Sequence, residues 1–101
     1  MAYRLVITPQ ARSQLRSIYS HIADAASPHV ARGFTDGIID SLTTLTEHPL
    51  IGAPRDDLRP GLRTLAHRRR AVIAFVVEGA AAVVVGVYYG GQDFETLRRE
   101  G

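Results

Sequence analysis

The sequence predicts an α+β fold in which a helical hairpin packs on a small antiparallel sheet. Two neighbouring segments near the N-terminus carry apolar residues every three or four positions, which is typical of amphipathic helices. One run rich in β-branched residues precedes them and three such runs follow, which indicates strands. The predicted order is β-α-α-β-β-β: an N-terminal strand, the helical hairpin, and a three-stranded antiparallel meander, all forming one sheet. A chain of 101 residues has the length of a single domain, 1–101.

The first strand is expected over residues 4–8, where β-branched and aliphatic residues predominate. Thr8 and Ser27 each precede a proline, and a hydroxyl N-cap followed by proline is a strong helix start. The first helix is expected to run to about Ala25, and the second must end before Pro49. The apolar positions of the two helices are Ala11, Leu15, Ile18, Tyr19 and Ile22, then Val30, Phe34, Ile38, Leu42 and Leu45.

The segment 49–61 is predicted to be a loop, because it holds three prolines, two glycines and four charged residues. Asp56 and Asp57 offer carboxylates to a cation. The neighbouring Arg55 and Arg59 favour a cluster of salt bridges instead.

Strands are expected over residues 62–66, 70–77 and 81–88, with a hairpin turn at Glu78. The last two runs are almost continuously apolar. This pattern fits central strands covered on both faces, or strands with one face held for a partner. A terminal helical turn is expected over 92–99.

Composition excludes several kinds of chemistry. The chain has no cysteine, so it cannot form a disulfide, an iron–sulfur cluster or a thiolate zinc site. All 12 basic residues are arginine, so no mechanism that needs a lysine operates here. The histidines stand at unrelated spacings, at His21, His29, His48 and His67, which disfavours a metal site. No cofactor and no metal are expected, and the absence of a signal peptide or a long apolar segment predicts a cytoplasmic protein.

Three consecutive arginines are the first candidate for function. If residues 68–70 lie on a strand, Arg68 and Arg70 share one face and Arg69 points to the other. Arg63 and His67 are close to them in sequence. This run fits either a charged, solvated strand edge or a binding patch for phosphate, nucleic acid or an acidic protein segment.

The tyrosine pair at the end of the last strand is the second candidate. Tyr88 and Tyr89 point to opposite faces of a strand, so one is expected in the core and the other on the surface. An exposed tyrosine near an arginine cluster suits a protein interface or a nucleic-acid stacking surface.

Motifs along nearly the whole chain resemble those of the RelE/ParE superfamily of toxins from type II toxin–antitoxin modules, nearer the ParE branch. The order of the motifs carries the resemblance, since no single one is diagnostic. They are the opening Tyr3–Ala11, the helix start Ser27-Pro28, the stop His48-Pro49, the segment Gly52–Arg63, the strand Arg68–Phe75 and the end Tyr89–Glu95.

The resemblance implies one of two activities. RelE-like members are mRNA interferases that cut codons in the ribosomal A site, whereas ParE-like members poison DNA gyrase and block replication. An arginine is a poor general base because it stays protonated, so a chain without lysine fits the nuclease pattern less well. The resemblance therefore implies a non-enzymatic gyrase inhibitor with no catalytic residue, and ribosome-dependent mRNA cleavage is the alternative.

The resemblance also implies a partner and two surfaces. A small ParD-like antitoxin neutralises such toxins in a hetero-oligomer, and DNA is reached only indirectly, through that complex. The face expected to engage the target comprises Arg63, Arg68, Arg70, Tyr88, Tyr89 and Asp93. The residues expected to face the antitoxin, where the core leaves them free, are Leu15, Ile18, Tyr19, Ile22, Phe34 and Ile38.

Overall fold

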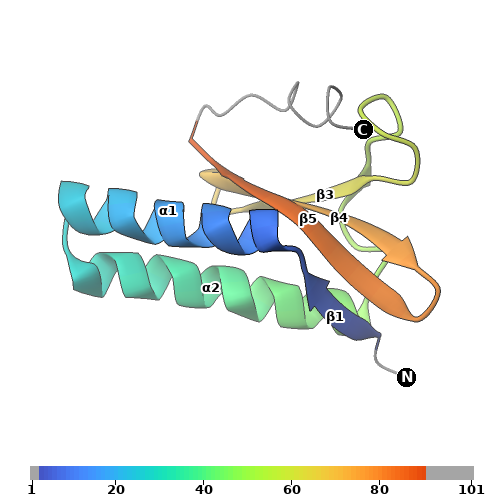
Figure 1. Ribbon diagram of the computed structural model, residues 1–101, viewed down its shortest axis with the longest axis horizontal. Helices are drawn as coiled ribbons and strands as arrows, with labels where there is room; N and C mark the ends of the chain where they lie inside the picture. Colours follow the sequence, from blue (N-terminus) through green and yellow to red (C-terminus); the bar gives the residue numbers. More distant parts are fainter. Residues whose placement is uncertain (1–2, 91–101) are drawn as a thin grey trace.

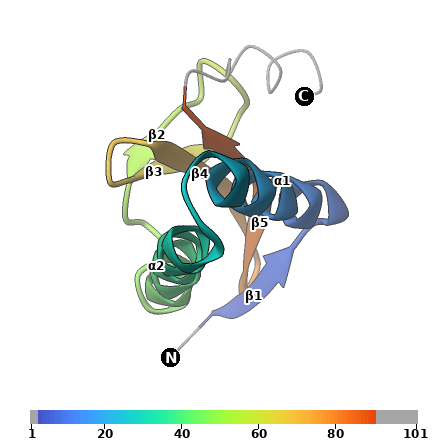
Figure 2. The same ribbon diagram turned by 90° about the vertical axis from the view of Figure 1, so that its left-hand side faces the viewer.

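The computed structural model describes residues 3–90, and the helical turn expected over 92–99 lies outside them. Two antiparallel helices run side by side and cover one face of a five-stranded sheet (Figures 1 and 2). The strand order in the sheet is β1-β5-β4-β3-β2. The elements are β1 (Arg4–Ile7), α1 (Pro9–Ala25), α2 (Pro28–Glu47), β2 (Ala53–Pro54), β3 (Arg63–His67), β4 (Ala71–Glu78) and β5 (Ala81–Tyr89).

The helix starts form as the sequence predicts. The side-chain oxygen of Thr8 accepts a hydrogen bond from the backbone N–H of Ala11 at 3.2 Å. The hydroxyl of Ser27 does the same for Val30 at 3.1 Å. Each cap satisfies one of the free N–H groups of a first helical turn, and the following proline has no N–H to satisfy. The two helices are thereby fixed as an adjacent pair with almost no linker.

The sheet differs from the prediction at its first strand. β3, β4 and β5 form the expected antiparallel meander, but β1 pairs with β5 in parallel, with Leu5 opposite Ala82. The sheet is therefore mixed. Strand direction depends on how the helical hairpin returns the chain to the sheet, and the residues of a four-residue strand do not specify it.

A fifth strand lies inside the predicted loop. Ala53 and Pro54 form β2, which pairs antiparallel with Thr64 and Arg63 of β3. Proline lacks the N–H needed in a central strand but is tolerated at the edge of a sheet, which is where β2 lies. A two-residue strand that contains proline leaves no recognisable pattern in the sequence.

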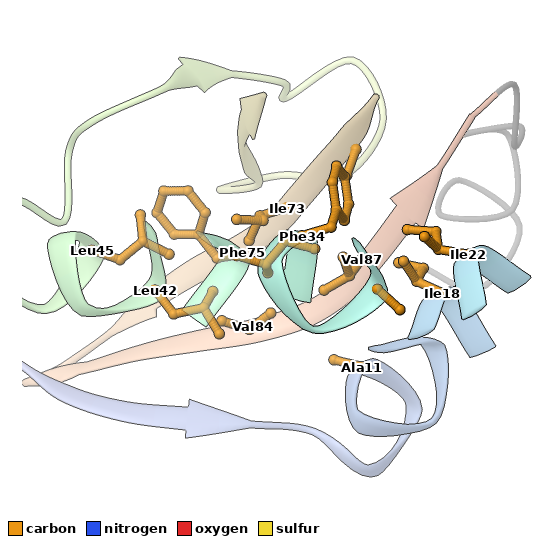
Figure 3. Close-up of a cluster of buried hydrophobic side chains, with 13 residues drawn as sticks. Ala11, Ile18, Ile22, Phe34, Leu42, Leu45, Ile73, Phe75, Val84 and Val87 are labelled. Atoms are coloured by element: carbon orange, nitrogen blue, oxygen red, sulfur yellow. The ribbon is translucent and has the colours of Figure 1, made fainter. Parts of the chain in front are cut away.

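The helices and the sheet share one hydrophobic core. Figure 3 shows side chains from α1, α2, β4 and β5 meeting in a single layer. A second, smaller cluster lies on the opposite face, where the loop after β2 folds over the strands and buries Leu58 and Leu62. The central strands are thus covered on both faces over part of their length, which explains their nearly continuous apolar sequence.

No helix within residues 3–90 is long and apolar enough to cross a membrane.

Removing side chain from the core should cost far more than removing the same side chain from the surface. Leu42 is 0% exposed in the main core, whereas Leu50 is 71% exposed. We expect Leu42→Ala to lower the free energy of unfolding by about 2–5 kcal/mol, because it leaves a cavity. Leu50→Ala should change it by less than about 0.5 kcal/mol. Urea denaturation of both variants measures the difference, and equal losses would contradict the assignment of the core.

Candidate functional site

The three consecutive arginines form the turn of the β3–β4 hairpin, named here the arginine turn (residues 68–70). Arg68 and Arg69 have positive φ angles of 51° and 59°. The N–H of Arg70 closes the turn by donating to the carbonyl of His67 at 3.0 Å. Its own carbonyl accepts from the N–H of Gly90 at 2.7 Å, which ties the turn to the end of β5.

The expectation that these arginines lie along a strand is wrong. β3 ends at His67 and β4 begins at Ala71, so residues 68–70 lie at the tip of the hairpin, with all three exposed. Two consecutive positive φ angles are the mark of a type I′ turn, which is usually built from Asn-Gly. With arginine at both positions, the sequence carries no sign of the turn.

No described residue neutralises the charges of the arginine turn. Within residues 3–90, none of the three arginines takes part in an ion pair. The predicted salt bridge in the loop, by contrast, is confirmed, because Arg55 holds Asp57 through two hydrogen bonds of 3.0 Å. Asp56 instead accepts the N–H of Gly61 at 2.8 Å. Within residues 3–90, the arginine turn therefore presents three positive charges without a carboxylate partner at one end of the sheet.

Arg63 does not join this group. It lies at the opposite end of β3, where its guanidinium donates to the carbonyls of Leu50 and Gly52 at 2.5 and 3.1 Å. These bonds hold the segment after α2 against the sheet. Arg63 thus has a structural task in the fold, and the structure separates it from Arg68 and Arg70.

Aromatic rings from four elements meet beside the arginine turn. The ring of Phe34 contacts those of His67 and Tyr89 edge-on, with centroids 5.1 and 5.4 Å apart. His21 of α1 extends the group, with its ring centroid 5.6 Å from that of Tyr89. This aromatic cluster (His21, Phe34, His67 and Tyr89) joins both helices to the ends of β3 and β5, and such edge-on contacts add to the stability gained from burial.

The two tyrosines point to opposite faces, as predicted, but neither is fully exposed. Tyr88 is 5% exposed and belongs to the small cluster with Leu58 and Leu62. Tyr89 is partly buried against the main core. The prediction of one core tyrosine is confirmed by Tyr88, whereas Tyr89 is only partly exposed, because the helices cover its face of β5.

His67 anchors the arginine turn to α2. Its side chain is buried, its Nδ1 lies 3.5 Å from the hydroxyl of Ser41, and its Nε2 has no hydrogen-bond partner. A β-carbon placed on Gly37 would lie 2.9 Å from Cε1 of the ring, so only glycine leaves room for the imidazole at this point of the helix. Burial, and secondly the charge of Arg68, lowers the pKa of His67 from its ordinary value of 6.5. The ring is accordingly neutral at neutral pH.

The apolar stripe expected to face an antitoxin is used by the core. Four of its six members are buried, at Ile18, Ile22, Phe34 and Ile38, and the other two, Leu15 and Tyr19, are partly buried against the same cluster. A single amphipathic pattern does not tell a stripe that packs internally from one that binds a partner. The four buried residues are therefore not on the surface of the folded chain.

Several features of the site escaped the sequence analysis. Arg69 shares the turn with Arg68 and Arg70, although alternation along a strand had set it apart. Gly37 is an isolated glycine within a helical pattern, and such a residue often has a packing reason. Asp93 lies outside the described residues. No group of three or more potential metal-binding side chains occurs in the described part of the chain.

A helical hairpin on one face of a sheet that includes an antiparallel meander is the fold of the RelE/ParE toxin superfamily. The sequence model described as "ParE toxin of type II toxin-antitoxin system, parDE" matches residues 5–94. Because this match spans most of the chain, the protein belongs to the family of ParE toxins. No curated protein sequence matches it.

Two solved structures are similar to this chain. The chromosomal ParDE toxin–antitoxin system of P. aeruginosa contains a chain with a TM-score of 0.78 and 26% sequence identity. That similarity covers 88% of this chain and 97% of the other. The RelBE2 toxin–antitoxin complex of Mycobacterium tuberculosis gives a TM-score of 0.62 and 16% identity over 91% and 95% of the two chains. At 16% identity, the second similarity shows the fold alone.

Two glycines of α2 provide a matched test of the anchor. A β-carbon on Gly33 would meet nothing within 4 Å, so Gly33→Ala should stabilise the protein by about 0.5–1 kcal/mol through helix propensity. Gly37→Ala gains the same propensity but must displace the ring of His67, and we expect a net loss of about 1–3 kcal/mol. Chemical denaturation measures both. Stabilisation by Gly37→Ala would show that the ring is not held there.

The lowered pKa of His67 makes stability depend on pH in one direction. The unfolded chain takes up the proton near pH 6.5 and the folded chain only at lower pH, so the unfolded state binds more protons as pH falls. The stabilisation is complete above pH 6.5 and is lost as pH drops through the folded-state pKa. We expect the unfolding free energy to fall more steeply between pH 7 and pH 5 in the wild type than in His67→Gln. Parallel curves for the two proteins would contradict a buried neutral imidazole.

Proposed function

We propose that this protein is the toxin of a type II toxin–antitoxin module and that it inhibits DNA gyrase. The match to the ParE family over residues 5–94 carries this proposal. The similarity to the ParDE system of P. aeruginosa supports the same branch. The arginine turn supplies the exposed, charged surface that a protein acting by binding, without chemistry of its own, would use.

The chemistry of the site argues against the alternative, a ribosome-dependent mRNA interferase. Such cleavage needs a base within reach of a ribose 2′-hydroxyl. Near the arginine turn the side chains of that kind are His67 and Tyr88, which are buried at 8% and 5% exposure, and Tyr89 and His21, whose rings pack against each other in the aromatic cluster. Arginine stays protonated and does not replace them.

An antitoxin partner is also part of the proposal. The two similar structures come from toxin–antitoxin systems, and this chain leaves apolar side chains on the outer surface of α2. Val30 is 50% exposed and Ile39 is 46% exposed. A short antitoxin segment with mixed apolar and charged residues fits this surface and would fold on binding. DNA would be contacted only through the complex of the two proteins.

A supercoiling assay with purified gyrase and relaxed plasmid tests the proposed activity. The expected result is inhibition of supercoiling together with an accumulation of cleaved DNA. If a folded sample leaves supercoiling unchanged but cuts mRNA in a translating extract, the proposal is wrong and the protein is an mRNA interferase.

The arginine turn should be required for inhibition. We expect Arg68→Ala/Arg70→Ala to raise the half-inhibitory concentration by about tenfold or more, since each lost charge-assisted contact is worth about 1.5–3 kcal/mol. The double variant Arg12→Ala/Arg16→Ala removes the same charge from the exposed side of α1 and should inhibit as the wild type does. Antitoxin binding should be retained by both variants. Full inhibition by a folded Arg68→Ala/Arg70→Ala protein would remove the turn from the target-binding surface.

A further inference from the structure

We propose that the arginine turn is a binding site for clustered carboxylates on an acidic protein segment, and that its left-handed backbone is kept for that purpose. The inference rests on the proposed function, since it names the chemistry that the turn recognises on the inhibited enzyme. Three properties of the turn carry it: its backbone conformation, its uncompensated charge and the weak overall charge of the protein around it.

The turn has a backbone conformation that is otherwise found only at glycines within residues 3–90. Within residues 3–90, six positions have a positive φ, and four of them are glycines: Gly52, Gly61, Gly79 and Gly90. The only two exceptions in that range are Arg68 and Arg69, which are neighbours in one turn. Residues with a β-carbon are strained in this conformation, and the turn type favours Asn-Gly. Strained backbone of this kind clusters at functional sites.

The second property is the positive charge of the turn. Three adjacent guanidinium groups repel one another, and no described carboxylate pairs with them. A bound anion would relieve this repulsion, so the arrangement favours an acidic ligand. Guanidinium groups bind carboxylates through paired, parallel hydrogen bonds, and this geometry is suited to a protein segment rich in Asp or Glu.

The charge of the whole protein favours a protein segment over DNA as the ligand. The net charge is only +2, and the exposed surface of α2 carries Asp36, Asp40 and Glu47. Direct binding to nucleic acid depends on many phosphate contacts and on a broad basic surface. A small acidic segment needs only the few guanidinium groups gathered at the hairpin tip.

Fluorescence anisotropy with two labelled probes tests the site directly. The probes are a hexaglutamate peptide and a 20-base-pair DNA duplex, each titrated at low salt with the full chain. The variant Arg68→Asn/Arg69→Gly installs the favoured turn sequence, and Arg12→Ala/Arg16→Ala is the charge-matched control. We expect the peptide to bind the wild type and the control within about twofold, and to bind the turn variant about tenfold more weakly or worse.

Three results would overturn the proposal. The first is that the peptide does not bind the wild type. The second is that both double variants lose affinity for the peptide equally, which would show a response to net charge. Alternatively, the DNA duplex would bind more tightly than the peptide and would be lost in the turn variant, which would identify a phosphodiester site instead.

Thermal unfolding tests whether the arginines of the turn stabilise the fold or serve binding at the expense of stability. Because Asn-Gly relieves the left-handed strain, the turn variant should melt higher than the wild type by about 4 °C or more. A lower melting temperature would mean that the arginines stabilise the fold and would overturn the argument from strain.

The supercoiling assay on the same proteins keeps the two proposals apart. If the wild type does not inhibit gyrase, the proposed function fails, and the peptide titration still decides the nature of the site. If the wild type inhibits gyrase and the turn variant inhibits it equally, the proposed function stands and the site is not what recognises the enzyme. Inhibition that is lost only in the turn variant supports both.

Discussion

The structure depends on the burial of one apolar stripe from each helix against a single face of the sheet. Ile18 and Ile22 of α1 pack in one cluster with Phe34 and Ile38 of α2 over the strands β4 and β5. Among the described residues, His67 is the one buried polar side chain of the protein. Hydrophobic burial of this kind is the largest favourable contribution to folding. It also limits which helix side chains a partner can contact, since a side chain that fills the core is not exposed.

The covering of the sheet leaves the β3–β4 turn exposed. The helices cover one face and the loop that carries Leu58 and Leu62 covers part of the other, whereas the arginine turn is exposed. The β3–β4 reversal is not a free loop. His67 extends from its base into the aromatic cluster and packs against Gly37, which links the position of the turn to that of α2. A partner that moved α2 would therefore also displace the arginine turn.

Local chemistry made much of the fold predictable. The hydroxyl caps at Thr8 and Ser27 placed both helices, and the β-branched runs placed the three meander strands within one or two residues. The parallel pairing of β1 was not predictable, because it depends on the path of the chain. The arginine turn was missed because its type is normally signalled by glycine. The single pattern of apolar residues also left the core and a partner surface indistinguishable until burial separated them.

The central claim is that the arginine turn meets the target in the proposed inhibition of gyrase. Hydrogen–deuterium exchange of the toxin alone and with purified DNA gyrase tests this claim most directly. The account predicts slower exchange in peptides that span residues 67–71 when gyrase is present, with α1 unchanged. Slower exchange confined to α1, with residues 67–71 unaffected, would contradict it.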